Sequence, residues 1–189
     1  MRLAYILLAA TLAYNLAEGF LTIIAGIETR SVVLLAFGAD SYLEVLAAAA
    51  VIWRLSYRDD EAGERAEQRA MRLIGATFLA LAVAIVFQSV YSLAARQGAD
   101  QSLLGVFVLT ASLVLMPAVS IAKFWVAART NMPVLAAEAK ETIACSYLTI
   151  TAMAGVLAVF LVGWWWLDAV GALFMVPWLV KEGREGIRA

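Results

Sequence analysis

The stretch VVLLAFGADSYLEVLAAAAVIW, residues 32–53, decides the class of fold, because it is mostly apolar and its only charged residues are two acids. As a helix rising ~1.5 Å per residue it would be roughly 30 Å long, which is the thickness of a bilayer's hydrocarbon core. Asp40 and Glu44 lie near its middle. The stretch therefore indicates a membrane-spanning helix that carries two carboxyl groups inside its apolar part.

The composition extends this indication to the whole chain. Hydrophobic residues make up 64% of the 189 residues and charged residues only 15%, and the mean hydropathy is +0.87. Soluble domains are about half apolar and about a quarter charged. Because so few polar side chains cannot cover a globule in water, the sequence predicts an integral membrane protein.

Charge, cysteine and histidine content exclude several functional classes. The net charge is −1, so the basic excess typical of nucleic-acid-binding proteins is missing. The single cysteine, Cys145, excludes an intramolecular disulfide and a metal site made of cysteines alone. The sequence has no histidine, which excludes Ser-His and Cys-His catalysis and histidine-based metal sites. Since no nucleophile stands beside a recognisable base either, we expect no enzyme.

Apolar runs separated by charged residues predict an all-α membrane protein with six transmembrane helices in a single domain, residues 1–189. The first five runs reach the ~20 residues that a membrane crossing needs, and the sixth is marginal. A signal peptide is the alternative for the first run, although no cleavage site is visible. Gly163 and the Trp164–Trp166 run predict the last hairpin, with its tryptophans at headgroup level. The predicted helices cover about 4–27, 31–54, 73–95, 102–127, 134–162 and 166–182.

The basic residues predict how these helices are oriented. Six crossings place both termini on one side, and twelve of the 14 Lys and Arg residues fall on that side, Lys123 included. Only Arg30 and Arg96 fall on the other side. Because cytoplasmic loops carry the basic excess, we expect cytoplasmic termini in a bacterial inner (plasma) membrane. The mixed-charge segment 55–72 is expected to be a solvated helix extension.

Asp40 and Glu44 are the first candidate ligands. A charged carboxylate at bilayer depth costs ~2.5–3.5 kcal/mol on insertion scales, so such a group usually faces a partner or a water-filled path. The two acids are four residues apart and share one face of the helix. Because like charges at this spacing repel, the pair needs a cation between its members or a proton on one of them. Protonated acids that join helices by hydrogen bonds are the structural alternative.

A second pair with the same spacing, Glu141 and Cys145, lies in helix 134–162. Because this helix runs antiparallel to that of Asp40 and Glu44, Cys145 would lie level with Asp40 and Glu141 level with Glu44. Counted from the outer ends of the two helices, however, Cys145 would lie roughly 10 Å deeper than Asp40. The four residues nevertheless form the set of four ligands that zinc takes, and we predict a metal site from them.

Each member of the second pair also has a simpler interpretation. Alone, Cys145 is a small buried hydrophobe, and Glu141 is an interfacial acid beside Lys140. Asn15 and Glu18, on one face of the first helix, either line the cation's path as a second shell or join helices by a hydrogen bond. Asp168, at the start of the last helix, is expected to cap that helix.

These residues lie in segments that resemble the transmembrane domain of the cation diffusion facilitator (cation efflux) family. The resemblance covers YNLAEGFLTIIAGIETRSVVLLAFGADSYLEVLAAAAVIWRL, residues 14–55, and AEAKETIACSYLTITAMAGVL, residues 137–157. It ends with GWWWLDAVGALFMVPWLVKEG, residues 163–183. The family binds its transported metal through four-residue-spaced pairs on its second and fifth helices. The resemblance places these pairs at Asp40 with Glu44 and at Glu141 with Cys145.

The sequence departs from the family pattern in two respects. Where the family more often has His and Asp on its fifth helix, this chain has Glu141 and Cys145. Family members usually continue into a cytoplasmic ferredoxin-like domain that helps them dimerise, and we expect no counterpart of it in these 189 residues. The resemblance still implies a homodimer.

The expected function is therefore export of a divalent cation from the cytoplasm, by exchange for protons, without a resident cofactor. A mixed oxygen and sulfur ligand set suits zinc best, with Cd²⁺, Fe²⁺, Co²⁺ or Mn²⁺ as alternatives. The partners expected are the cation, protons and membrane lipid, and no nucleic acid. The main alternative is a membrane scaffold or assembly subunit whose buried acids are structural, and a channel is a further one.

Overall fold

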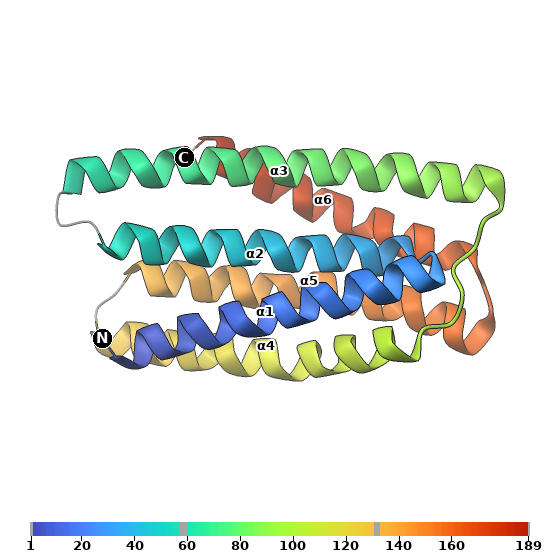
Figure 1. Cartoon of the computed structure of the whole chain (residues 1–189), viewed down its shortest axis with the longest axis horizontal. Coiled ribbons are helices and arrows are strands. Elements are labelled where there is room, and N and C mark those ends of the chain that lie inside the picture. The colour runs from blue at the N-terminus through green and yellow to red at the C-terminus, as the bar shows by residue number, and fades with distance from the viewer. Residues whose placement is uncertain (1, 57–59, 131–132, 189) are drawn as a thin grey trace.

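The computed structural model describes residues 2–56, 60–130 and 133–188, and at some of these, Glu141 included, the backbone alone. The described residues contain no strand and form six helices, joined up and down into one antiparallel bundle (Figure 1). The helices are α1 Arg2–Thr29, α2 Val32–Ser56, α3 Asp60–Ala95, α4 Leu103–Thr130, α5 Pro133–Val162 and α6 Trp166–Arg188.

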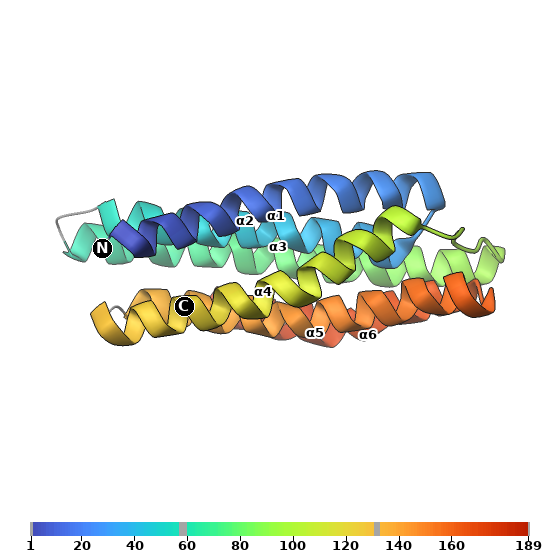
Figure 2. The same ribbon diagram turned by 90° about the horizontal axis from the view of Figure 1, so that it is seen from below.

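The bundle has two ends, which we name by the direction of the helices. At the terminal end α1, α3 and α5 begin and α2, α4 and α6 end, so both chain termini lie toward it (Figure 1). At the far end the chain turns from α1 to α2, from α3 to α4 and from α5 to α6. The most extensive contacts between helices are those of α3 with α6, α1 with α2 and α4 with α5. Helix α4 crosses the bundle obliquely in Figure 2.

Five of the helices are long and apolar enough to cross a membrane, and α6 is not one of these five. Large apolar side chains, such as Val83, Phe87 and Phe107, are exposed on the outside of the bundle. A soluble bundle would turn polar residues outward, whereas a lipid-facing surface is apolar. The chain thus has the architecture of an integral, multi-pass helical membrane protein.

The six predicted helices are all present, and only the start of α3 and the end of α6 differ from the prediction by more than three residues. Helix α3 begins at Asp60, so most of the segment 55–72 extends it, as expected. Helix α6 continues to Arg188 rather than ending near 182, and α1 begins at Arg2. Hydropathy marks where lipid contact ends, but a helix continues into water wherever its backbone hydrogen bonds continue.

The turns at the far end follow local stereochemistry. Arg30 and Arg96, the two basic residues predicted at this end, have φ values of 57° and 50° and terminate α1 and α3. Gly163, with a φ of 71°, follows the last residue of α5. A left-handed residue is a common helix terminator, and glycine adopts this conformation without steric cost. The predicted hairpin at Gly163 is therefore present.

Helices α1 and α2 approach closely at glycine positions. A Cβ atom on Gly38 would lie 2.6 Å from Oγ1 of Thr22 and 3.1 Å from the carbonyl oxygen of Gly19. Small residues at a crossing allow two transmembrane helices to pack backbone against backbone. This contact brings polar side chains of α1 within reach of the acids on α2.

Candidate cation site

Three of the four predicted ligands lie together in the middle of the bundle. One oxygen of Asp40, one oxygen of Glu44 and the sulfur of Cys145 all lie within 4.8 Å of one another. Asp40 is almost fully buried, and Glu44 and Cys145 are half-buried. The site therefore joins the four-residue pair of α2 to the facing side of α5, as the spacing predicts.

The predicted mismatch in depth between the two helices does not occur. Gly155 of α5 lies against Val33 of α2, since a Cβ atom on this glycine would be 3.4 Å from the valine side chain. Because α2 begins only one residue before Val33, the last turns of α5 project beyond α2 at the far end. Counting both helices from a common outer plane was wrong, and Cys145 reaches the level of Asp40 and Glu44.

The fourth predicted ligand, Glu141, is outside the residues whose side chains the structure describes. Its backbone belongs to α5, one turn before Cys145 and toward the terminal end. Its role as a ligand stays a prediction.

Helix α1 forms one hydrogen bond to the cluster, at Glu44, and one beside it, at Ser41. Nδ2 of Asn15 donates to Oε2 of Glu44 at 2.5 Å, and Oγ of Ser41 donates to Oε2 of Glu18 at 3.0 Å. The same Ser41 hydroxyl lies 3.1 Å from the carbonyl oxygen of Phe37. Both residues of α1 that were candidates for the cation path therefore lie beside the ligands.

The cluster concentrates negative charge and acceptor oxygens in a buried place. Glu18 lies close enough to both Asp40 and Glu44 for electrostatic repulsion, and the Cys145 thiol is hydrogen-bonded with the Asp40 carboxylate. Among the described residues, Oδ1 of Asp40, Oε1 of Glu18 and Oδ1 of Asn15 find no hydrogen-bond donor. Buried acceptors without donors are costly, and a bound cation would remove that cost.

A cavity of about 270 Å³ leads from the cluster toward the terminal end. Asn15, Glu44 and Cys145 line the inner part of this cavity. Its outer part is lined by Met71 of α3 and by Glu182 and Glu185 near the end of α6. Thr11 and Ala48, each about one turn closer to the terminal end than Asn15 and Glu44, also line it. The residues that line the cavity therefore extend from the site toward the terminal end.

The structure corrects the prediction for Lys123, which was counted among the basic residues at the membrane surface. The side chain is completely buried in α4, and its Nζ donates to Oγ1 of Thr142 on α5 at 3.2 Å. Thr142 lines the cavity one turn before Cys145. Lys123 stands inside the apolar run of α4, so the reasoning applied to the buried acids would have found it.

Asp168 lies in the first turn of α6, as predicted, and its carboxylate also bonds to the start of α2. Its carboxylate accepts hydrogen bonds from Oγ of Ser31 at 2.5 Å and from the backbone N–H of Val32 at 2.7 Å. Val33 donates to the same carboxylate at 3.4 Å. Asp168 therefore caps the beginning of α2 in addition to its predicted place at the positive end of α6.

The spacing of the three ligand atoms suits a small metal ion after a modest adjustment. Around tetrahedral zinc, with bonds of about 2.0–2.3 Å, neighbouring ligand atoms would lie about 3.5 Å apart. The three atoms lie within 4.8 Å of one another, so rotation of the side chains would close the remaining gap. Two carboxylates and a thiolate bind zinc-like divalent cations in other metal sites.

Compared with models of known protein families, the chain matches none, and no curated protein gives a significant match. The comparisons therefore leave the cation diffusion facilitator resemblance as a hypothesis, to be judged by the chemistry of the site.

Proposed function

We propose that the protein is a secondary transporter of zinc-like divalent cations that exchanges them for protons, as the resemblance to the cation diffusion facilitator family implies. The observation that carries the proposal is the meeting of Asp40, Glu44 and Cys145 within 4.8 Å, at the inner end of a cavity about 270 Å³ in volume. An ionisable cluster at membrane depth, reached by a cavity, is typical of an ion pathway.

Protons are the coupled ions in this proposal because protonation and metal binding compete for the same groups. A cation binds deprotonated carboxylates and thiolate, so protons that occupy Asp40 and Glu44 release it. In a carrier, this competition produces exchange when the site faces each side of the membrane in turn. The mechanism requires no resident cofactor and no covalent step.

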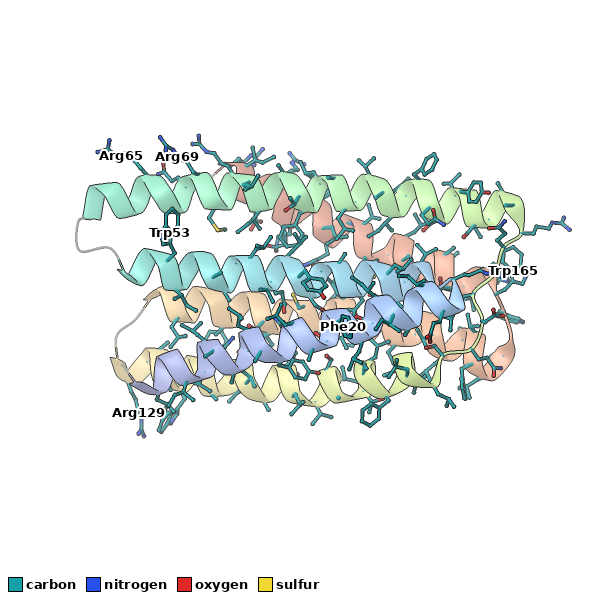
Figure 3. The ribbon with its side chains drawn as sticks, viewed as in Figure 1. Phe20, Trp53, Arg65, Arg69, Arg129 and Trp165 are labelled. Carbon is teal, nitrogen blue, oxygen red and sulfur yellow. The ribbon has the colours of Figure 1, made fainter. Side chains whose placement is uncertain are left out.

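The distribution of basic residues indicates which end of the bundle faces the cytoplasm, and this orientation gives the direction of transport. Arg65, Arg69 and Arg129 lie toward the terminal end, whereas Trp165 lies at the far end (Figure 3). Since cytoplasmic segments are rich in basic residues, the terminal end is proposed to be cytoplasmic, in a bacterial inner membrane. Helix α6 serves as the sixth crossing in this proposal. The cavity would then admit the cation from the cytoplasm, and transport would be export, with a homodimer as the unit.

Uptake into proteoliposomes tests this function. Vesicles that contain the protein are given Zn²⁺ outside and a pH gradient, and a zinc-sensitive dye reports uptake inside. Wild-type protein should accumulate Zn²⁺ uphill when protons flow the opposite way, and Asp40→Ala and Glu44→Ala should reduce uptake to that of empty vesicles. Uptake that both substitutions leave unchanged would show that the cluster is not the cation's path.

The same vesicle experiment distinguishes the transporter from the two alternatives, a membrane scaffold and a channel. The hydrogen bonds from Asn15 to Glu44 and from Ser41 to Glu18 join α1 to α2, and such contacts favour a structural role for the acids. A scaffold would give no uptake, whereas a channel would equilibrate Zn²⁺ without accumulating it against its gradient.

A further inference from the structure

Two residues of α1 carry buried acceptor oxygens near the cluster of Asp40, Glu44 and Cys145. Asn15 uses its Nδ2 to donate to Glu44, so its carbonyl oxygen is left as an acceptor. Glu18 receives the Ser41 hydroxyl on Oε2 and has the Tyr14 hydroxyl near its carboxylate. Neither Asn15 Oδ1 nor Glu18 Oε1 has a hydrogen-bond donor among the described residues.

Both side chains are deeply buried, which makes these unused oxygens informative. Asn15 is 1% exposed and Glu18 is 3% exposed. A polar atom placed so deep without a donor loses free energy, unless it binds something when the protein works. Asn15 also lines the cavity that leads to the cluster, so a cation that enters the cavity meets its side chain.

The register of α1 against α2 fixes which ligand each residue joins. Asn15 pairs with Glu44, and Glu18, one turn farther toward the far end, pairs with Ser41, the neighbour of Asp40. The close glycine contact of Gly19 with Gly38 holds this register. Asn15 therefore stands on the cavity side of the cluster and Glu18 on the side of the far end.

We propose that α1 supplies two further cation ligands, Asn15 Oδ1 and Glu18 Oε1, to the site formed by Asp40, Glu44 and Cys145. This inference rests on the proposed function, because it completes the same site. Four oxygens and one sulfur then surround the ion. A set of five donors dominated by oxygen suits Mn²⁺, Fe²⁺ and Co²⁺ as well as Zn²⁺. Three carboxylates around one ion also favour a divalent cation over a monovalent one.

Binding of Mn²⁺ to the purified full-length protein, measured by titration calorimetry, tests the role of Glu18. Glu18→Gln keeps the shape of the side chain and an acceptor for Ser41, but it removes the charge. We expect Mn²⁺ binding to weaken by at least ~10-fold, the size of effect that lost metal-site partners have. Glu28→Gln, an exposed acid on the same helix, is the matched control and should bind like wild type.

The Asn15→Asp variant tests whether Asn15 is a cation ligand or only a hydrogen-bond partner of Glu44. Asp offers an oxygen in place of the amide oxygen, yet it cannot donate to Glu44. A ligand role predicts Mn²⁺ binding at least as tight as that of wild type, whereas a purely structural role predicts weaker binding, because the hydrogen bond to Glu44 is lost. The ultraviolet charge-transfer band of a Cd²⁺–thiolate bond should persist in both variants, since it reports Cys145 alone.

The outcomes distinguish this inference from the proposed function. If wild type binds Mn²⁺ and Glu18→Gln binds it equally well, α1 supplies no charged ligand and the inference is overturned. If Glu18→Gln does not fold, the result for Asn15→Asp decides: weaker binding overturns the inference and retained binding supports it. If wild type binds neither Mn²⁺ nor Zn²⁺, the proposed function fails together with the inference.

Discussion

The two ends of the bundle are held together in different ways. At the far end, polar groups of separate turns bond directly: Asp168 accepts from Ser31 and Val32, and the backbone N–H of Asp100 donates to the carbonyl oxygen of Thr29 at 2.8 Å. A further bond there runs from Nε2 of Gln101 to the carbonyl oxygen of Phe160, at 3.1 Å. Toward the terminal end, Ser120 and Lys123 of α4 bond to α5, and residues of α1, α2, α3, α5 and α6 line a cavity.

In the proposed transporter, this difference would let a buried charged cluster be accessible and yet not leak. The ligands lie at the inner end of the cavity, whose other lining residues lie toward the terminal end, so on this account the cation enters from that end. A channel would be hollow on both sides, whereas a carrier is open on one side at a time. On this account the terminal half admits the cation, and the contacts of the far end must separate before it leaves.

The largest expected effect comes from blocking the cavity. Ala47, one turn from Glu44 toward the terminal end, lines the cavity. Ala47→Phe should fill the space that the cation crosses and reduce proteoliposome uptake to the background. Ala49→Phe, at an exposed position of the same helix, is the control and should transport like wild type. Normal uptake by Ala47→Phe would show that the cavity is not the entrance.

Chemical labelling of Cys145 gives the next largest effect. The thiol lines the cavity and is the only one in the chain, so its reaction with a small, charged, membrane-impermeant thiosulfonate reports accessibility. In vesicles of known orientation, we expect modification many times faster when the reagent faces the terminal end. Saturating Zn²⁺ should protect the thiol. Equal rates from both sides would contradict a closed far end.

A moderate effect on stability is expected at the far end. Asp168→Ala removes the acceptor for Ser31 and Val32, and an unmet buried donor costs about 1–3 kcal/mol. The temperature of unfolding in detergent should therefore fall, and it should fall less for Asp168→Asn, which keeps one acceptor oxygen. If both variants unfold at the same temperature as the wild type, the Asp168 contacts do not hold the far end closed.

The smallest effect concerns the choice of metal. Cys145→Ser replaces the thiolate by a neutral hydroxyl, so Cd²⁺, which prefers sulfur, should bind at least ~10-fold more weakly. Mn²⁺ binding should change little, because oxygens hold most of its coordination. Competition between the two cations on wild type and variant measures this directly, and an unchanged preference for Cd²⁺ would remove Cys145 from the site.

Local sequence patterns predicted much of this arrangement. Long apolar runs predicted six helices, and equal four-residue spacings predicted that Asp40 and Glu44 would meet Cys145 across the bundle. These signals depend only on helix periodicity and hydropathy, so tertiary packing need not be known. The hairpin at Gly163 followed from residue type in the same way.

Contacts that depend on how the helices pack were not predictable. The bond from Ser31 to Asp168 joins residues 137 positions apart, and nothing local to either residue specifies the other. The depth of Cys145 depended on how far α5 projects beyond α2. For Asn15 and Glu18 the sequence left a pathway and a structural role open, and only the register of α1 against α2 places them beside the ligands.

The most direct test of the central claim is the zinc K-edge X-ray absorption spectrum of protein loaded with one equivalent of Zn²⁺. The account predicts one sulfur neighbour at about 2.3 Å, with the remaining neighbours oxygen at about 2.0–2.2 Å. The sulfur should disappear in Cys145→Ser, and Asp40→Ala with Glu44→Ala should bind no stoichiometric zinc. A wild-type spectrum with oxygen neighbours alone would contradict a site that joins Asp40 and Glu44 to Cys145.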